Sequence, residues 1–476
     1  MSIRKPASVL MFLTMQTLPK ILLWTALVNV AALAPSLTSA QAPPTDLKYA
    51  HWAMFGDVSQ RREALRDITF QRNAQMVAPL VYALRYRGGN RADRVVKALQ
   101  KITGKSFGDD WFRWMQWLQR QPNYQTLPRF DVFLSNVLKS LDPKFGQFVY
   151  PGVKHSIGLH EIVWGGVAAE TGIPPLDRPA MIDPKDATYL SKNEQVFGVS
   201  INGEARAYPY RFMDWHEMLN DEVGGTPISL AYCTLCGSGI LYATHAEGLK
   251  PPITFGSSGL LYRSNKLMFD HKTHSLWNQF TGEPVVGELT DSGIKLNVLP
   301  LVSTTWAKWL AANPQTQVMH PTTGFDRDYA PGKPYGGYFS DPKLMFPAPI
   351  TDRSLAQKAR VFGLRMSGAS KAWPLKTFRG GKVINDQIGV LKIVLVGHQK
   401  TQQVRAYRRA DYEFSKSDSE LTTLFAQKTK ETNGSRWRVT EAALVGPNNE
   451  QLTRLPGHLA YWFAWQNYFG GDTLAN

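Results

Sequence analysis

The two cysteines of this chain are its clearest candidates for chemistry, because both lie in one motif, Cys233-Thr234-Leu235-Cys236, which Gly237 follows. Strand-like runs flank the motif at residues 228–232 and 240–243. We therefore expect the cysteines at the tip of a β-hairpin. In a thioredoxin-type pair the second cysteine enters a helix, whose N-terminus lowers the pKa of the thiol. The glycines at 237 and 239 argue against such a helix.

Three kinds of site remain open for this pair. Two thiolates are soft ligands that suit copper or zinc, and a glycine after the hairpin lets backbone N–H groups turn toward the sulfur atoms. Exported thiols tend to oxidise, so a disulfide, redox-active or structural, is the second alternative. The third is a pair of buried, inert thiols. We expect no haem, since position 237 is not the histidine that haem attachment needs. We expect no nucleotide cofactor either.

A metal at the cysteines would need further ligands, because the chain lacks the second cysteine pair of a zinc ribbon. His216 is the first candidate, and a site of Cys233, Cys236 and His216 is our metal prediction. His245, His271 and His274 are weaker candidates.

Polar residues after the motif could line a polar pocket. Residues 255–259 look like a Gly/Ser-rich turn, and turns with buried polar anchors are the alternative. A serine nucleophile at Ser257 or Ser258 is disfavoured, because the Gly-x-Ser-x-Gly spacing lacks one residue. No catalytic residue is assigned. The predicted pocket-lining residues are Glu217, Arg263, Asn265, Asp270, Trp277 and Gln279.

The main body of the chain reads as one domain present twice. Residues 196–209 match residues 361–374 at an offset of 165, and a second block around Trp306 matches one around Trp462. Each copy is predicted to be mostly β, with an opening hairpin and a closing aromatic helix at 304–312 or 459–469. The cysteines and the Trp215-His216-Glu217 segment occur only in the first copy, which makes them candidates for function. Asn220 and Asp221 have counterparts in the second copy and are predicted to serve turns or caps.

The region before this body predicts helices. Apolar residues recur at helical spacing from about residue 50 to 122, and short helix pairs of this kind resemble HEAT-type repeats. We therefore predict an α+β protein: a small HEAT-like helical layer followed by a duplicated, mostly β domain. The predicted divisions are a signal peptide at 1–40, the helical region at 41–140, the first copy at 141–328, a Pro/Gly/aromatic connector at 329–350, and the second copy at 351–476.

The N-terminus has the layout of a secretory signal. Arg4 and Lys5 precede an apolar stretch at 21–34 and small residues at 38–40. Cleavage after Ala40 would release a periplasmic or secreted protein without a membrane span; an uncleaved anchor is the alternative. The formal net charge is +16, yet the basic residues are scattered, so we expect no nucleic-acid partner. A cell-envelope partner would suit such a charge.

Four ordered motifs carry a resemblance to a known family. They are Trp215-His216-Glu217-x-x-Asn220-Asp221, Tyr232-Cys233-x-Leu235-Cys236-Gly237, Phe255-Gly256-x-Ser258-Gly259-Leu260 and Ser275-x-Trp277-x-Gln279. Together they resemble the signature blocks of DUF3179, exported bacterial proteins of unknown function, over about residues 145 to 476. The family usually has proline at 234 and arginine at 271, where this chain has Thr234 and His271. The resemblance implies no activity.

The preferred hypothesis is an exported protein that binds a soft metal ion or carries a redox-active thiol pair. An alternative is a non-catalytic cell-envelope binding module with a structural disulfide. Whether the chain is an enzyme stays open; a third hypothesis is an enzyme whose pocket joins Asn265, Asp270 and Gln279 to the cysteines.

Overall fold

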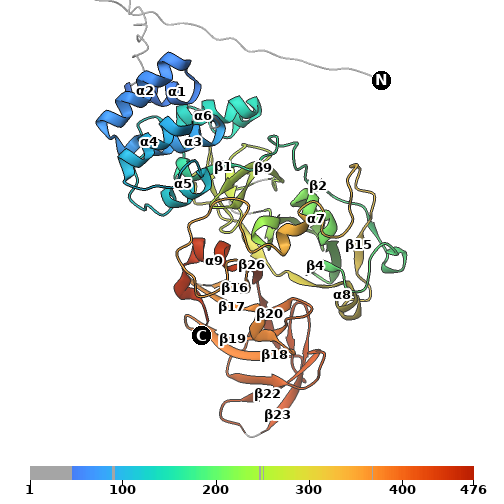
Figure 1. The fold of residues 1–476 in the computed structure, drawn as a ribbon. Helices are drawn as coiled ribbons and strands as arrows, with labels where there is room; N and C mark the ends of the chain where they lie inside the picture. Colours follow the sequence, from blue (N-terminus) through green and yellow to red (C-terminus); the bar gives the residue numbers. More distant parts are fainter. Residues whose placement is uncertain are drawn as a thin grey trace, which may run out of the picture. The chain divides into compact units, whose positions relative to one another are not determined.

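The computed structural model describes residues 45–87, 92–245, 248–249, 251–366, 368–431 and 433–475, so the predicted signal peptide lies outside the described residues. The N-terminal helices expected from the apolar spacing are present, and α4 ends where Gly104 takes a positive φ of 67°. Six α-helices are described here, in blue to green in Figure 1: α1 (Thr45–Phe55), α2 (Val58–Gln71), α3 (Val77–Arg87), α4 (Ala92–Thr103), α5 (Trp111–Leu118) and α6 (Phe130–Leu141).

Specific hydrogen bonds join this helical layer to the β body. The Tyr82 hydroxyl on α3 donates to the carbonyl oxygen of Ile162, and the Arg85 guanidinium donates to the carbonyl oxygen of Trp164 at 2.7 Å. The side-chain amide of Gln116 on α5 donates to the carbonyl oxygen of Ala348 at 3.0 Å. No helix among the described residues is long and apolar enough to cross a membrane.

Three five-stranded sheets form the first part of the β body, together with helices α7 (Tyr210–His216) and α8 (Trp306–Ala312). The first sheet has the order β1 (Ile162–Trp164), β9 (Phe255–Tyr262), β10 (Asn265–Asp270), β11 (Leu276–Asn278), β12 (Glu283–Val286). The second has the order β13 (Asn297–Leu299), β8 (Ser238–Ala243), β7 (Thr226–Cys233), β6 (Met218–Val223), β2 (Leu176–Asp177). The third has the order β14 (Val302–Thr305), β4 (Gln195–Ile201), β5 (Glu204–Pro209), β15 (Gln317–Met319), β3 (Met181–Ile182).

The C-terminal part, orange to red in Figure 1, holds two more sheets and helix α9 (Trp462–Phe469). One sheet has the order β17 (Ala369–Pro374), β16 (Arg360–Met366), β26 (His458–Tyr461). The other has eight strands in the order β18 (Lys382–Ile388), β19 (Leu391–His398), β20 (Gln403–Arg408), β25 (Gln451–Leu455), β24 (Ala443–Val445), β23 (Gly434–Val439), β22 (Thr423–Lys428), β21 (Tyr412–Lys416). The protein is therefore a mixed α+β fold, as predicted.

Several contacts recur in the two parts of the body. The hairpins β4–β5 and β16–β17 each place a glycine under a helix tryptophan. A Cβ atom on Gly198 would lie 2.2 Å from the Trp309 ring, and one on Gly363 would lie 1.8 Å from the Trp465 ring. Strands β4 and β5 pair around a turn in which Asn202 has a positive φ of 49°, so the opening hairpin predicted for the first copy is confirmed.

Two predictions about local structure are wrong. Asn220 and Asp221 lie within strand β6 instead of in a turn or cap: Asp221 accepts hydrogen bonds from Arg206 and Tyr208 at 2.6 and 2.7 Å. Residues 255–259 are also strand, because they belong to β9 and pair with β10. Small residues resemble a turn in sequence, but here they belong to a strand that is buried along its whole length and pairs with β10.

Candidate functional site

The cysteines lie at the tip of the β7–β8 hairpin, as predicted. Strand β7 ends at Cys233, a 3₁₀ turn covers Thr234–Cys236, and β8 begins at Ser238. Gly237 has a positive φ of 58°. Its N–H donates to the carbonyl oxygen of Thr234 at 3.2 Å, so this N–H closes the turn instead of pointing at a sulfur atom. A side chain at 237 would also crowd Tyr461, whose ring lies 3.1 Å from an added Cβ.

Both thiols are free and buried, with exposed fractions of 1% for Cys233 and 0% for Cys236. Their Sγ atoms lie 2.8 Å apart, with the Cys233 thiol donating to Cys236. The Cys236 thiol in turn donates to the carbonyl oxygen of Ser264 at 3.3 Å. Burial, together with the hydrogen bond to Cys233, raises the pKa of Cys236 well above its ordinary value. Cys236 therefore keeps its proton at neutral pH.

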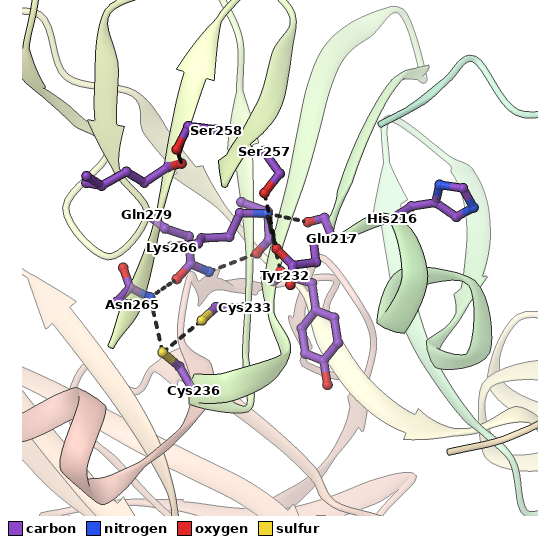
Figure 2. A network of polar contacts seen from close by, with 12 residues as sticks. His216, Glu217, Tyr232, Cys233, Cys236, Ser257, Ser258, Asn265, Lys266 and Gln279 are labelled. Carbon is purple, nitrogen blue, oxygen red and sulfur yellow. Dashed lines mark hydrogen bonds and ion pairs between the residues drawn. The ribbon is translucent and has the colours of Figure 1, made fainter. Parts of the chain in front are cut away.

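Two buried amides connect this sulfur pair to the sheets around it. The Gln279 side-chain amide donates to the carbonyl oxygens of Ala231 and Ser238 at 2.9 and 3.1 Å. Its Oε1 accepts from Asn265 Nδ2 at 2.7 Å, and the same Nδ2 donates to Cys236 Sγ at 3.3 Å. Figure 2 shows this relay beside the cysteines. The structure thus places Asn265 and Gln279, two of the predicted pocket-lining residues, next to the cysteines.

A buried cation lies next to the hairpin. Lys266 on β10 is 2% exposed, and its Nζ donates to the carbonyl oxygens of Glu217 and Tyr232 at 3.0 and 3.4 Å. It also pairs with the Glu217 carboxylate at 3.4 Å. Burial lowers the pKa of Lys266, and the charge of Glu217 opposes that shift. Sequence reasoning missed Lys266, although a lysine directly before Leu267 in an apolar strand was an available signal.

The connector covers the cysteine turn. The Tyr335 hydroxyl donates to Glu217 Oε1 at 2.8 Å, and the Tyr338 hydroxyl donates to the carbonyl oxygen of Leu235 at 2.7 Å. Tyr338 is buried, and Lys358 Nζ lies 3.5 Å from the centre of its ring. The aromatic content of this connector was noted from the sequence, but its contact with the site was not.

His216 does not reach the cysteines. Its Nδ1 lies 2.8 Å from the carbonyl oxygen of Pro174 and its Nε2 lies 2.6 Å from the Tyr329 hydroxyl. Figure 2 shows the ring turned away from the sulfur atoms. Within the described ranges no group of three or more His, Cys, Asp and Glu side chains is arranged to hold a metal ion. Metal binding by the cysteines therefore stays a prediction.

The three weaker histidine candidates, His245, His271 and His274, have partners or exposure that do not involve the cysteines. His245 is exposed at the surface. His271 Nδ1 lies 2.8 Å from the Thr254 hydroxyl, and His274 lies 3.6 Å from the Glu170 carboxylate.

The remaining predicted pocket residues anchor turns and strands. Arg263 pairs with Glu161 at 2.7 Å. Asp270 accepts a hydrogen bond from the Trp277 indole at 2.9 Å and thereby ties β10 to β11. The predicted set thus divides: Glu217, Asn265 and Gln279 belong to the network around the cysteines, and the others serve the fold. The Ser257 hydroxyl donates to the Glu217 carboxylate, and the Ser258 hydroxyl donates to the carbonyl oxygen of Leu267.

Comparison with known families agrees with the motifs. The family described as "Protein of unknown function (DUF3179)" matches residues 170–472, most of the chain. The chain belongs to the DUF3179 family. Both cysteines, both amides and the connector of this DUF3179 protein lie inside the matched region. No curated protein and no solved structure matches the chain. The family description names no activity, so the chemistry has to be inferred from the site itself.

Proposed function

We propose that this DUF3179 protein is an exported thiol–disulfide exchange protein whose Cys233 and Cys236 alternate between dithiol and disulfide. The observation that carries the proposal is the 2.8 Å separation of the two sulfur atoms, one on Cys233 directly before the 3₁₀ turn and the other on Cys236 at its end. A sulfur–sulfur bond is about 2.05 Å long, so oxidation needs a small movement of two side chains and no rearrangement of the strands. Burial excludes water and restricts which thiols or disulfides can react.

The exchange is balanced with an external disulfide as oxidant. The thiolate of one cysteine attacks the external disulfide, forms a mixed disulfide and releases one external thiolate. The second cysteine loses its proton and attacks the first, which forms the Cys233–Cys236 bond and releases the second external thiolate. Two electrons pass from the cysteines to the external disulfide. The two protons that leave the cysteines are taken up by the two external thiolates, which become thiols. The reverse sequence reduces the protein.

Two features favour exchange over metal binding. His216, the first candidate for a third ligand, is hydrogen-bonded through both ring nitrogens. The sulfur atoms also lie closer together than about 3.8 Å, the separation that two Zn–S bonds of 2.3 Å subtend at a tetrahedral ion. Copper or zinc would therefore have to spread the turn.

Thiol counting and metal analysis on the purified protein separate these alternatives. After mild oxidation and denaturation without reductant, the exchange proposal predicts no free thiol in wild type and one in each single variant, Cys233→Ser and Cys236→Ser. Reduction should restore both thiols in wild type. Copper or zinc bound to wild type, and lost in Cys233→Ser, would instead favour a metal site. A double serine variant that keeps full cellular function would favour the non-catalytic binding module.

The export of the protein belongs to the same proposal. A cleaved signal peptide at residues 1–40 would bring the thiols into an oxidising compartment. Cell fractionation with N-terminal sequencing tests this: the mature chain should begin near Gln41 and be recovered outside the cytoplasm. Recovery in the cytoplasm with an intact N-terminus would contradict export.

We also infer that residues 141–328 and 351–476 are two copies of one domain and that the N-terminal helices form HEAT-type pairs. The recurring glycine–tryptophan contacts support the duplication. Further support comes from two asparagines at the same offset: Asn220 bonds both main-chain groups of Phe255, and Asn385 does the same for Phe414. The adjacent packing of α1 with α2 and of α3 with α4 supports the helix pairs.

A further inference from the structure

We propose that Asn265 is a catalytic residue of this exchange: it makes Cys236 the internal sulfur, which attacks or leaves inside the protein, and Cys233 the sulfur that meets the external disulfide. Gln279 acts through Asn265 as a positioning residue. The inference rests on the proposed function, since it assigns roles within the same cysteine pair. It is carried by the unequal surroundings of the two sulfur atoms and by the fixed orientation of one amide.

The two sulfur atoms differ in their contacts. Cys236 Sγ has three polar neighbours, namely Cys233 Sγ, the carbonyl oxygen of Ser264 and Asn265 Nδ2, at 2.8, 3.3 and 3.3 Å. Among the contacts of the described residues, Cys233 Sγ has one, to Cys236. Cys236 is therefore held by polar groups of its own protein, whereas Cys233 has no polar partner besides Cys236 in the described part of the chain. Both sulfur atoms are buried, so local opening must precede the reaction, and the sulfur without other polar partners is the one we assign to the external disulfide.

The orientation of Asn265 follows from a chain of donors and acceptors. The carbonyl oxygens of Ala231 and Ser238 can only accept, so they hold the amino group of Gln279 toward themselves. Gln279 Oε1 must then face Asn265, and it can only accept a hydrogen bond. The amino group of Asn265 is thereby fixed toward both Gln279 and Cys236, because reversing this amide would bring two oxygen atoms together. A donor thus points permanently at one sulfur of the pair.

This donor stabilises the charge that exchange places on Cys236. During oxidation of the protein, Cys236 must carry negative charge as it attacks the mixed disulfide at Cys233. During reduction, the electron pair of the breaking Cys233–Cys236 bond moves onto Cys236 Sγ. Burial disfavours that charge, and a hydrogen bond from a fixed amide opposes the penalty. Oxidation and reduction pass through the same transition state, in which Cys236 carries negative charge, so the hydrogen bond from Asn265 accelerates both reactions.

A two-phase reaction with dithionitrobenzoate, an aromatic disulfide whose thiolate is coloured, tests the assignment on the reduced full-length mature chain. Attack by Cys233 releases the first coloured thiolate, and attack by Cys236 on the mixed disulfide releases the second. Asn265→Leu, which has a similar volume but no donor, should slow the second release about tenfold or more and leave the first unchanged. Asn265→Asp, which keeps the shape and replaces the donor by an acceptor, should slow it at least as much.

Serine variants and a matched asparagine complete the design. Cys236→Ser should release one coloured thiolate at the wild-type rate, and Cys233→Ser should be nearly unreactive while folded. Asn220→Leu changes a buried asparagine of the same body that contacts no cysteine, and it should leave the second phase unchanged. The equilibrium of the Cys233–Cys236 pair with glutathione should also be unchanged in Asn265→Leu, because both directions slow together.

Three results would overturn the assignment of roles: a second phase of wild-type rate in both Asn265 variants, equal slowing of both phases, or a Cys233→Ser protein that reacts faster than Cys236→Ser. A different result would overturn the proposed function. In that case wild type would release one coloured thiolate, or none, and would never form the internal disulfide, whatever residue stands at 265.

Discussion

Lys266 and Glu217 bring opposite charges into the buried surroundings of the cysteine hairpin, with exposed fractions of 2% and 6%. Their separation of 3.4 Å, and the two carbonyl oxygens that accept from Lys266, compensate for the loss of water around the ammonium group. One of these carbonyls belongs to Tyr232, the residue before Cys233. The ion pair therefore stabilises the main chain at the point where the cysteine turn begins.

Replacing Lys266 by methionine should destabilise the fold by about 3–5 kcal/mol, because it leaves the Glu217 carboxylate buried without its cation. The double variant with Glu217→Gln should recover part of this loss. Urea unfolding of both variants measures the effect. As a control, Lys308→Met removes a partly exposed lysine that pairs with Glu420 and should change stability by at most about 1 kcal/mol. Equal stability of Lys266→Met and wild type would contradict a paired, charged lysine.

At the scale of elements, we expect the connector to control access to the thiols, because two of its tyrosines bond groups around the cysteine turn. Tyr335 and Tyr338 lie in or next to the 3₁₀ turn Gly336–Phe339, and their hydroxyls bond Glu217, which precedes the cysteines, and Leu235, which lies between them. On the proposed function, we expect an external disulfide to reach buried Cys233 when these contacts open. Local opening of this kind needs far less free energy than global unfolding.

Tyr338→Ala should therefore raise the rate of alkylation of Cys233 by iodoacetamide about tenfold, since it removes one hydrogen bond and the ring that packs on the turn. Mass spectrometry of native protein over time gives the rate. Tyr150→Ala, at an exposed tyrosine, is the matched control and should not change it. Equal rates in all three proteins would show that the thiols are reached by another path.

The two opening hairpins give a test of the inferred duplication. Gly198→Ala and Gly363→Ala should each destabilise the protein by about 1–3 kcal/mol, because the added methyl group overlaps the ring of Trp309 or Trp465. Gly337→Ala should be near neutral, since an added Cβ meets nothing within 4 Å there. Thermal unfolding measures all three. If one of the two hairpin variants is as stable as Gly337→Ala, the two glycines do not have the same role.

The helices and hairpins were predictable because their signals are local: helical spacing before residue 122, and the turns at Asn202-Gly203 and at the cysteines. Strand pairing was harder, since the small residues of β9 look like a turn until their partner strand is known. The site was predictable in part. Both cysteines, Asn265 and Gln279 were named from the sequence, but Tyr335 lies 118 residues from Glu217 in sequence, and no local pattern indicates that contact.

At the scale of the whole molecule, buried charges connect the two parts of the β body. Glu441 has a side chain that is 8% exposed and lies between Arg405 and Arg454, and Arg405 Nε donates to it at 3.0 Å. Arg454 also donates to the carbonyl oxygen of Leu301 in the first part at 3.0 Å. Burial alone would raise the pKa of Glu441, but the two arginines lower it from 4.5 to about 2.

This shift predicts a loss of stability in acid. As the pH falls through 4.5, Glu441 takes up a proton in the unfolded state, while in the folded state it stays charged down to about pH 2. The unfolded state therefore binds more protons in this range, which lowers the free energy of unfolding. The stabilisation from this group is therefore complete above pH 4.5 and disappears towards pH 2. Glu441→Gln should be less stable than wild type at neutral pH, and the difference should shrink in acid. Urea unfolding at several pH values checks this; a constant difference would contradict the pairing.

The central claim is that Cys233 and Cys236 form one reversible two-electron couple, and a redox titration tests it most directly. Mature wild-type protein is equilibrated in glutathione buffers of graded potential, trapped with an alkylating reagent under denaturing conditions, and weighed by mass spectrometry. We predict that both thiols disappear together, with the slope of a two-electron transition and full recovery on reduction, and that neither single serine variant shows this transition. Thiols that stay alkylatable at every potential, or that are lost one at a time to separate glutathione adducts, would contradict the account.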